Sequence, residues 1–583
     1  MQASFIFFLL QLLLVAALTP EDWVYISLTV VPPPSHWKRD VRVPGDRIIH
    51  VDLVFSVDEA RADKAAEALA GVSDPRSPTF GHYWNARDVV DLLAPPKESI
   101  REVARWLTSA GKESYVASET YLLPHGISKH IDFVVPGPGP ALNHHVPEFV
   151  SVRSLDGLRP RETRKIDCFK YMAPDCLSQL YNFEDGADLK AHPENSLGFY
   201  TPSYSTWLAE DMDKFFADFA PYLVGKRPAM MRINGGYQQE DIKVPSFNME
   251  PNLDYQYSMA MADPVPVANI QVGDNTTAAN LNVMLAAFNK DYCKMALDPE
   301  FDPVSPNSTD CGTHQPPRVI GIAYAWNEAW YSDKYLHRQC LEYLKLGLQG
   351  VTVLTGSGDR GPTDQLGYCI DPNTGNYTAE EGHFASVFPA SCPWITTVGG
   401  TQFVPHNLTW AEGAKFPAET ALDDNTTTSG GGFSRLFSAP WYQAGLTHEY
   451  LTGAKGALDL AKEGYFNAEG RGYPDISAMS LNYLVNLYGD YRAVKGTSTA
   501  VPLMASMFAR INNERLHAGK ATIGFVNPVL YGHRNQFVRD VEAGVNEGCG
   551  VDAAFPAARA WDAVTGLGSL DYAKLKDLYL RLP

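Results

Sequence analysis

The chain has 583 residues, which is more than one hydrophobic core usually supports, so we expect two to four domains. Its composition is that of an ordinary globular protein, with 45% hydrophobic and 20% charged residues. The formal net charge of -19 argues against nucleic acid as a partner and suits a protein that stays soluble in a mildly acidic medium.

The chain begins with an apolar segment over residues 5–18, which only Gln11 interrupts. It is too short to span a membrane and has the length of a secretory signal core, so we assign a signal peptide to residues 1–18. No later stretch is long and apolar enough for a bilayer, and we expect a soluble mature chain without a membrane partner. The expected destination is extracellular, with an acidic vacuole or lysosome as the alternative.

Sequons and cysteines fit the secretory route. Five Asn-x-Ser/Thr sequons, which predict a glycoprotein, begin at Asn275, Asn307, Asn376, Asn407 and Asn425. The eight cysteines are Cys168, Cys176, Cys293, Cys311, Cys340, Cys369, Cys392 and Cys549. Their even number predicts disulfide bonds, but the sequence does not determine which cysteines pair. None lies before residue 168, which indicates that the first part of the chain is a separate unit.

Hydrophobic periodicity divides the chain into two regions. In the first region it predicts strands over residues 47–57, 115–123 and 131–135, and helices over 58–69, 85–93 and 97–110. This pattern indicates a small α+β domain over residues 19–158. A basic linker without a hydrophobic pattern follows over residues 159–167, and we expect the chain to be cut there.

The second region, residues 168–583, alternates between strand and helix patterns. Strands are predicted over residues 267–272, 319–323, 352–355 and 394–398, and helices over 253–262, 277–293, 332–348 and 501–513. Such alternation is typical of a mostly parallel sheet flanked by helices on both faces. Functional groups of such folds gather at the carboxyl ends of the strands.

Ser498 lies between small residues, directly before the helical pattern that starts at Val501. Pro502 suits the first turn of that helix. A serine in this position is commonly a helix N-cap. The free backbone N–H groups of a helix start can also stabilise negative charge beside a nucleophile. A base and an oxyanion donor must be found before the second interpretation is preferred.

Three carboxylates are candidates for these roles. Glu250 and Asp254 are four residues apart and share one face of a helix whose first turn is expected to hold Pro251. Two acids so close repel unless they share a proton, although a solvated acidic helix face is the alternative. Asp359 follows a predicted strand in a glycine-rich turn, where an aspartate can also simply bond its own backbone.

Three better-known kinds of catalytic site lack their motifs in this sequence. A subtilisin-type site needs a histidine base, usually in His-Gly-Thr, and none of the fifteen histidines has that context. The two Asp-Thr/Ser-Gly motifs of a pepsin-like enzyme and the His-Glu-x-x-His motif of a zinc peptidase are also absent.

The motifs, taken in order, resemble those of the sedolisins, the acid-acting serine-carboxyl peptidases. Residues 72–84 resemble the family's propeptide, and the remaining matches to the family are residues 173–181, 249–257, 357–359, 429–434, 472–477 and 496–498. The resemblance implies an α/β subtilisin-like catalytic domain over residues 168–583 and a ferredoxin-like α+β propeptide domain, which serves as chaperone and intramolecular inhibitor.

The same resemblance implies the roles of the site residues. Ser498 is the nucleophile, Glu250 its base, Asp254 the group that orients the base, and Asp359 the oxyanion donor. A carboxylate base works best near its own pKa, and a carboxyl donor must be protonated, so both roles predict activity in acid.

A second resemblance, over residues 538–541 and 558–568, is to the sedolisin calcium site. Asp540 and Asp562 would supply carboxylates, and Val541, Ala558 and Ala560 would supply backbone carbonyls, to one structural Ca²⁺. The family usually has glycine at the two alanine positions, so a loop that needs positive φ would be strained here.

The sequence therefore predicts a secreted, monomeric acid serine peptidase, made as a zymogen, that acts on peptides and proteins. The resemblance, which is strongest to fungal-type sedolisins with tripeptidyl-peptidase activity, implies that it releases tripeptides from free N-termini. An endopeptidase with the same catalytic residues is the nearest alternative. A catalytically dead secreted binding protein of the same fold is a further one.

Overall fold

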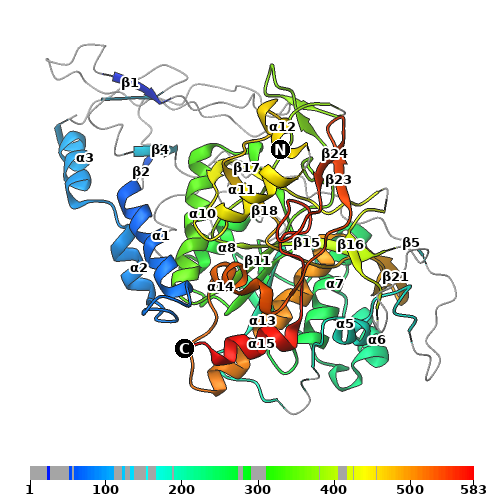
Figure 1. Ribbon diagram of the computed structural model, residues 1–583. Helices are drawn as coiled ribbons and strands as arrows, with labels where there is room; N and C mark the ends of the chain where they lie inside the picture. Colours follow the sequence, from blue (N-terminus) through cyan, green and yellow to red (C-terminus); the bar gives the residue numbers. More distant parts are fainter. Residues whose placement is uncertain are drawn as a thin grey trace. The chain divides into compact units, whose positions relative to one another are not determined.

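The computed structural model in Figure 1 describes the greater part of the chain. The described residues are 58–109, 166–184, 186, 189–273, 280–289, 310–379, 381–404, 416–424, 426–454 and 456–583, with the backbone of five strands before residue 155. The predicted signal peptide, most of the linker and the sequons at Asn275, Asn307, Asn407 and Asn425 lie outside them. The chain forms two compact units, one of residues 1–65, 86–144 and 276–314, the other of residues 66–85, 145–275 and 315–583.

The first unit has α+β character, as predicted. Strand β1 (Trp23–Ile26) pairs with β3 (Tyr121–Pro124), and β2 (Val51–Phe55) pairs with β4 (Ile131–Pro136), both antiparallel. Its helices are α2 (Ala86–Leu93), α3 (Lys97–Ser109) and α8 (Leu281–Phe288). Helix α1 (Glu59–Ser73) begins in the first unit and ends in the second. Helix α2 buries Val89 and Leu93, whose spacing of four places them on one face.

The second unit is built on an eight-stranded sheet. Its strands are β6 (Leu197–Pro202), β7 (Ala229–Ile233), β8 (Val267–Val272), β9 (Val319–Ile322), β11 (Thr352–Gly356), β15 (Thr396–Phe403), β16 (Glu419–Ala421) and β19 (Ile476–Met479). The order is β16-β15-β11-β9-β6-β8-β7, and β19 also pairs with β15. All these pairs are parallel except β15 with β16. The predicted parallel sheet is confirmed.

Helices pack around this sheet in Figure 1. They are α5 (Pro174–Leu180), α6 (Ala209–Phe219), α7 (Pro245–Ala262), α10 (Asp333–Leu348), α11 (Ala444–Gly453), α12 (Ala457–Lys462), α13 (Ala500–His517), α14 (Asn527–His533) and α15 (Tyr572–Arg581). Helix α13, which follows Ser498, packs against β9, β11 and β15 and against α7 and α15. Its central position explains why its residues 500–513 are all buried. Among the described residues, no helix combines the length and the apolar character needed to cross a bilayer.

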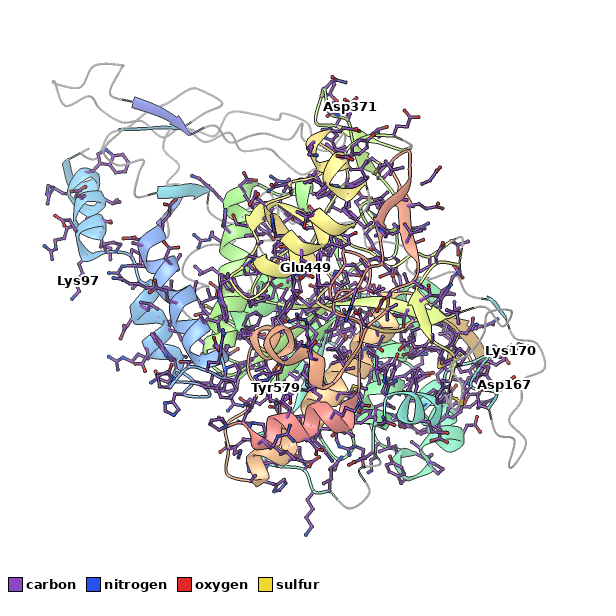
Figure 2. All side chains as sticks on the ribbon, in the orientation of Figure 1. Lys97, Asp167, Lys170, Asp371, Glu449 and Tyr579 are labelled. Carbon is purple, nitrogen blue, oxygen red and sulfur yellow. A yellow bond between two sulfur atoms is a disulfide. The ribbon has the colours of Figure 1, made fainter. Side chains whose placement is uncertain are left out.

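Short ladders complete the second unit. They pair β10 (Trp326–Asn327) with β14 (Val387–Phe388), β12 (Cys369–Ile370) with β13 (Tyr377–Thr378), β17 (Gly432–Ser438) with β18 (Gly470–Tyr473), β22 (Val538–Arg539) with β25 (Ser569–Leu570), and β23 (Val545–Gly548) with β24 (Val551–Pro556). A three-stranded sheet joins β20 (Tyr483–Leu487), β21 (Asp490–Val494) and β5 (Arg153–Ser154). Figure 2 labels Asp371 at the tip of the β12–β13 hairpin, and the sequon residue Asn376 is exposed in the same turn.

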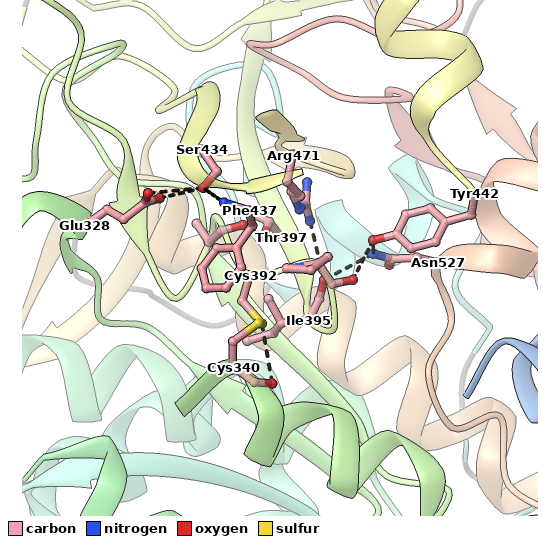
Figure 3. The surroundings of a disulfide bond; sticks show 12 residues. Glu328, Cys340, Cys392, Ile395, Thr397, Ser434, Phe437, Tyr442, Arg471 and Asn527 are labelled. Atoms are coloured by element: carbon pink, nitrogen blue, oxygen red, sulfur yellow. Dashed lines mark hydrogen bonds between the residues drawn. A yellow bond between two sulfur atoms is a disulfide. The ribbon is translucent and has the colours of Figure 1, made fainter. Parts of the chain in front are cut away.

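Disulfides and a buried ion pair hold distant segments together. The bonds are Cys168–Cys176, Cys340–Cys392 and Cys369–Cys549, and Cys311 is also disulfide-bonded. Figure 3 shows Cys340–Cys392 joining α10 to the segment before β15. Near it, the fully buried Arg471 and Asp475 form an ion pair with an N–O distance of 2.6 Å. The prediction of disulfides is confirmed, and the fold decides their pairing.

Candidate active site

Helix α7 carries Glu250 and Asp254, and it begins earlier than the sequence indicated. It starts at Pro245, so the prediction that Pro251 occupies the first turn is wrong: Pro251 lies inside the helix. A proline there leaves the carbonyl four residues earlier without its helical donor. That carbonyl, of Phe247, accepts instead from the backbone N–H of Thr206 at 2.8 Å. A neighbouring loop therefore stabilises the interruption next to Glu250.

The two acids on α7 are buried, at 4% exposure for Glu250 and 1% for Asp254, which rules out a solvated helix face. Burial, and after it the charge of Asp359, raises the pKa of Glu250 from 4.5 to about 8. The pKa of Asp254 is raised well above its usual range, first by burial and then by the charge of Glu250. Because two adjacent charges without solvent repel, the pair holds a proton far above the pH at which free carboxyl groups lose theirs.

Ser498 lies in a 3₁₀ turn, η4 (Thr497–Thr499), directly before α13. It is not the N-cap of α13, because Thr499 has that position and makes no side-chain cap hydrogen bond. Helix α7 packs against this turn. The Ser498 hydroxyl lowers the pKa of Glu250, so it faces that carboxylate. Neither oxygen of Glu250 makes a hydrogen bond of standard geometry within the described part of the chain, although both are buried.

Asp359 follows the carboxyl end of β11, as predicted, and the turn of Ser498 holds it. Its Oδ1 accepts from the backbone N–H of Thr497 at 2.7 Å and from the Thr497 hydroxyl at 3.1 Å. Burial raises the pKa of Asp359, and the two bonds from Thr497 oppose that rise. Gly496 makes the approach possible, because a Cβ on it would lie 2.7 Å from Oδ2 of Asp359. The glycine also has a φ of 121°, which side chains disfavour.

Tyr324 is a site residue that the sequence analysis did not identify. It follows the carboxyl end of β9 and is buried, with its ring at 5.6 Å from the ring of Tyr200. Burial raises its pKa well above the usual value, and the charges of Glu250 and Asp254 add to the rise. The side chain is therefore near enough to the acid pair for their charges to act on its hydroxyl. The only available signal was its place just after a strand of the parallel sheet.

The structure thus brings Ser498, Glu250, Asp254 and Asp359 into one buried centre at the carboxyl side of the sheet. A serine hydroxyl next to a carboxylate has an acceptor for its proton. A protonated carboxyl group held beside the serine turn can donate a hydrogen bond to an oxygen that becomes negative. Together these groups provide the nucleophile, the base and the hydrogen-bond donor that attack on a carbonyl carbon requires.

The predicted metal residues also come together. The N–H of Ala560 donates to Oδ2 of Asp540 at 2.7 Å, and the N–H of Ala558 donates to Oδ2 of Asp562 at 3.0 Å. Asp562 is fully buried, and burial raises its pKa to about 7. Ala560 has a φ of 80°, the glycine-type conformation that the family pattern suggested, whereas Ala558 is not among the residues with positive φ. A buried and an exposed carboxylate that accept hydrogen bonds from the same loop offer oxygen ligands of the kind that a hard cation takes.

Known proteins place the chain in a class. The family model "Pro-kumamolisin, activation domain" matches residues 35–119. Tripeptidyl-peptidase SED1 of Arthroderma otae is 34% identical, over 94% of this chain and 96% of that protein. Aorsin of Aspergillus oryzae is 32% identical, over 94% of this chain and 95% of that protein. Among solved structures, the serine-carboxyl proteinase sedolisin of Pseudomonas, complexed with pseudo-iodotyrostatin, has 22% identity and a TM-score of 0.49, over 70% of this chain and 98% of that one.

The two fungal relatives each cover 94% of this chain. The protein is a serine-type peptidase with an activation domain at its N-terminal side. It belongs to the sedolisin family.

Proposed function

We propose that the chain is the zymogen of a secreted acid peptidase that removes tripeptides from free N-termini, with Ser498 as nucleophile. The observation that carries this proposal is the buried acid pair on α7 facing the serine turn that also binds Asp359. The names of two relatives, Tripeptidyl-peptidase SED1 of Arthroderma otae and sed1 of Aspergillus fumigatus, support the tripeptide product.

The reaction follows from the positions of these groups. Ser498 Oγ forms a bond to the substrate carbonyl carbon while its proton passes to Glu250. Asp254, protonated, keeps Glu250 in place and spreads the remaining negative charge. Asp359, protonated, donates to the carbonyl oxygen as it becomes negative, a contact typically worth about 2.7–4 kcal/mol. The C–N bond then breaks, the leaving amine takes the proton from Glu250, and water releases the acyl group by the same steps.

Acid is the working condition because the site needs protons on two of its three acids. The raised pKa of Asp359 keeps its donor available in weak acid. The resting acid pair on α7 holds two protons in acid; one must leave before Glu250 can act as the base, while the other stays and orients it. Activity should therefore be lost as the pH rises and Asp359 and the pair give up these protons.

The propeptide is proposed to inhibit the enzyme until the linker over residues 159–167 is cut. Strand β5, directly before this linker, adds to β21 in antiparallel register, with Ser154 opposite Arg492. Strand β21 leads into Ser498 within four residues. Backbone pairing of this kind is a common way for one segment to bind another. It supports a path of the uncut chain close to the catalytic serine.

Calcium is proposed as a structural ion held by the carboxylates of Asp540 and Asp562 and the carbonyls of Val541, Ala558 and Ala560. When bound, the ion would supply positive charge to the buried Asp562 and brace the loop that follows β24. Two observations support this site: Asp562 is buried, and Asp540 and Asp562 each accept a hydrogen bond from a backbone N–H of the same loop, those of Ala560 and Ala558.

The decisive experiment compares wild-type zymogen with Ser498→Ala, acidified in the presence of calcium. Wild type should cut its linker and release successive tripeptides from a long peptide with a free N-terminus, seen by mass spectrometry. Ser498→Ala should do neither. Internal cuts would indicate an endopeptidase, and an active alanine variant would contradict the mechanism. If correctly processed wild-type protein cleaved no peptide across the acidic range, the binding-protein alternative would replace the proposal.

A further inference from the structure

A propeptide segment packs into the peptidase body away from the catalytic serine. Residues 66–85 lie inside the match to the activation domain, yet they belong to the same compact unit as the sheet. Leu69, Val72 and Phe80 of this segment are at most 4% exposed. A Cβ on Gly347 would lie 2.9 Å from Leu69, so α10 and this segment are in close contact. The segment is thus bound by a packed apolar surface.

Tyr83 inserts between two glycines of the peptidase. A Cβ on Gly350 would lie 2.6 Å from the Tyr83 ring, and a Cβ on Gly524 would lie 2.4 Å from its hydroxyl oxygen. No side chain other than hydrogen fits at either position while the tyrosine is in place. The hydroxyl is buried without a hydrogen-bond partner among the described residues. The ring is therefore held by its shape and not by its polar end.

The space between Gly350 and Gly524 that holds Tyr83 is called the slot below, and the two segments that form it are hydrogen-bonded to each other. Thr522 donates through its hydroxyl to the carbonyl of Gly350 at 2.8 Å, and Thr352 donates to the carbonyl of Gly524 at 2.5 Å. These two reciprocal bonds hold segments 350–352 and 522–524 at a fixed separation. Next to Tyr83, the backbone N–H of Trp84 donates to the carbonyl of Leu348 at 2.8 Å. The slot is part of the fold and its occupant is fixed in register.

The slot and the catalytic centre lie at opposite ends of strand β11. Gly350 comes just before β11, whereas Asp359 follows its carboxyl end. The five residues of β11, at about 3.3 Å each, separate these two ends by roughly 16 Å. A ring in the slot does not reach Ser498, so this contact retains the propeptide without occupying the substrate site.

We propose that Tyr83 is the anchor that keeps the cleaved propeptide on the peptidase through the Gly350–Gly524 slot. Cutting the linker frees the chain near β5 and leaves the anchor in place, so that activation takes two steps, cleavage and then release from the slot. This inference rests on the proposed zymogen function. Its test measures retention of the cut segment, which does not depend on catalysis.

The test uses the full chain with Ser498→Ala, so that it cannot digest itself, and with a recognition site for a foreign protease placed within residues 159–165. After that protease cuts, the two pieces are followed by size-exclusion chromatography and by the dissociation rate of the labelled propeptide. Tyr83→Ala should dissociate about 30-fold faster or more, which is the effect of losing a part-buried aromatic anchor of about 2 kcal/mol. Tyr83→Phe should be retained as well as the parent, because the hydroxyl has no partner. His82→Ala, an exposed neighbour, is the matched control and should leave the rate unchanged.

Equal dissociation of the Tyr83→Ala and His82→Ala proteins would overturn the proposal. If Tyr83→Ala does not fold, hydrogen exchange on the cut Ser498→Ala parent decides the matter. The amides of Trp84 and of residues 349–352 should stay protected for as long as the propeptide co-elutes. Loss of that protection while the pieces remain together would show that another contact retains the propeptide, and would equally overturn the proposal. Neither outcome bears on whether Ser498 is the nucleophile.

Discussion

Replacement of Glu250 by glutamine should stabilise the protein at neutral pH and leave it unchanged in acid. Glutamine has nearly the shape of a protonated glutamate and cannot ionise. In the folded chain burial raises the pKa of Glu250 from 4.5 to about 8. The unfolded chain releases this proton near pH 4.5, whereas the folded chain keeps it. Between these two values the folded state binds more protons, so the stability of the wild-type protein falls as the pH rises.

The size of the effect follows from that difference. Each pH unit above 4.5 lowers the folding stability by about 1.4 kcal/mol for one retained proton. At pH 7 the penalty is about 3 kcal/mol, and Glu250→Gln removes it. At pH 4 both states of the wild-type chain hold the proton and the variant gains nothing. Glu250 is 4% exposed, so solvent does little to screen this cost.

Thermal or denaturant unfolding at pH 4 and pH 7 measures the prediction, with Ser498→Ala present in every protein to prevent self-digestion. Glu449→Gln is the control, because Glu449 is exposed on α11, where Figure 2 labels it. The control should change stability equally at both pH values. A Glu250→Gln advantage that is the same at both, or greater in acid, would refute the reasoning about the buried pair.

Three further outcomes are expected. Gly496→Ala should lower kcat in a peptide assay by roughly 10²–10³, because its Cβ would displace Asp359. Gly489→Ala is the control: Gly489 also has a positive φ, 83°, but a Cβ there would meet no atom within 4 Å, so kcat should be unchanged. Ala560→Gly should raise the free energy of unfolding by about 1 kcal/mol in denaturant titrations, since it relieves a φ of 80°; a loss of stability would contradict that account. With calcium present at 100 times its dissociation constant, the wild-type protein should have a free energy of unfolding about 2.7 kcal/mol higher than after removal of the ion by a chelator. An unchanged unfolding midpoint would count against the ion.

Local pattern was enough to locate the chemistry. The predicted strand over residues 267–272 coincides with β8, and Asp359 does follow its strand. Glu250 and Asp254 lie on the same helix, as their spacing of four predicted, and both are buried. These features depend on the periodicity of side chains along a strand or helix and on a few residues in sequence, so they can be read without the fold.

Prediction from local pattern failed where a residue distant in the chain supplies a missing hydrogen bond. Proline at 251 predicted a helix start, because its missing N–H leaves a carbonyl without a donor. In the fold Thr206, far away in the chain, supplies that donor, and the helix continues through the proline. Likewise Ser498 does not cap α13, because Thr499 has the N-cap position and Ser498 lies in the 3₁₀ turn before it, where Thr497 binds Asp359.

The sequence by itself indicated the parallel sheet through the alternation of strand and helix patterns, and it indicated the class of the protein and the four residues of the proposed catalysis through short motifs that resemble those of the sedolisins. Only the tertiary structure decided that Cys369 pairs with Cys549 and that Tyr324 lies near the acid pair. It alone placed Tyr83 between Gly350 and Gly524. The physical reason is that close packing joins residues hundreds of positions apart, and no local periodicity records which surfaces will meet.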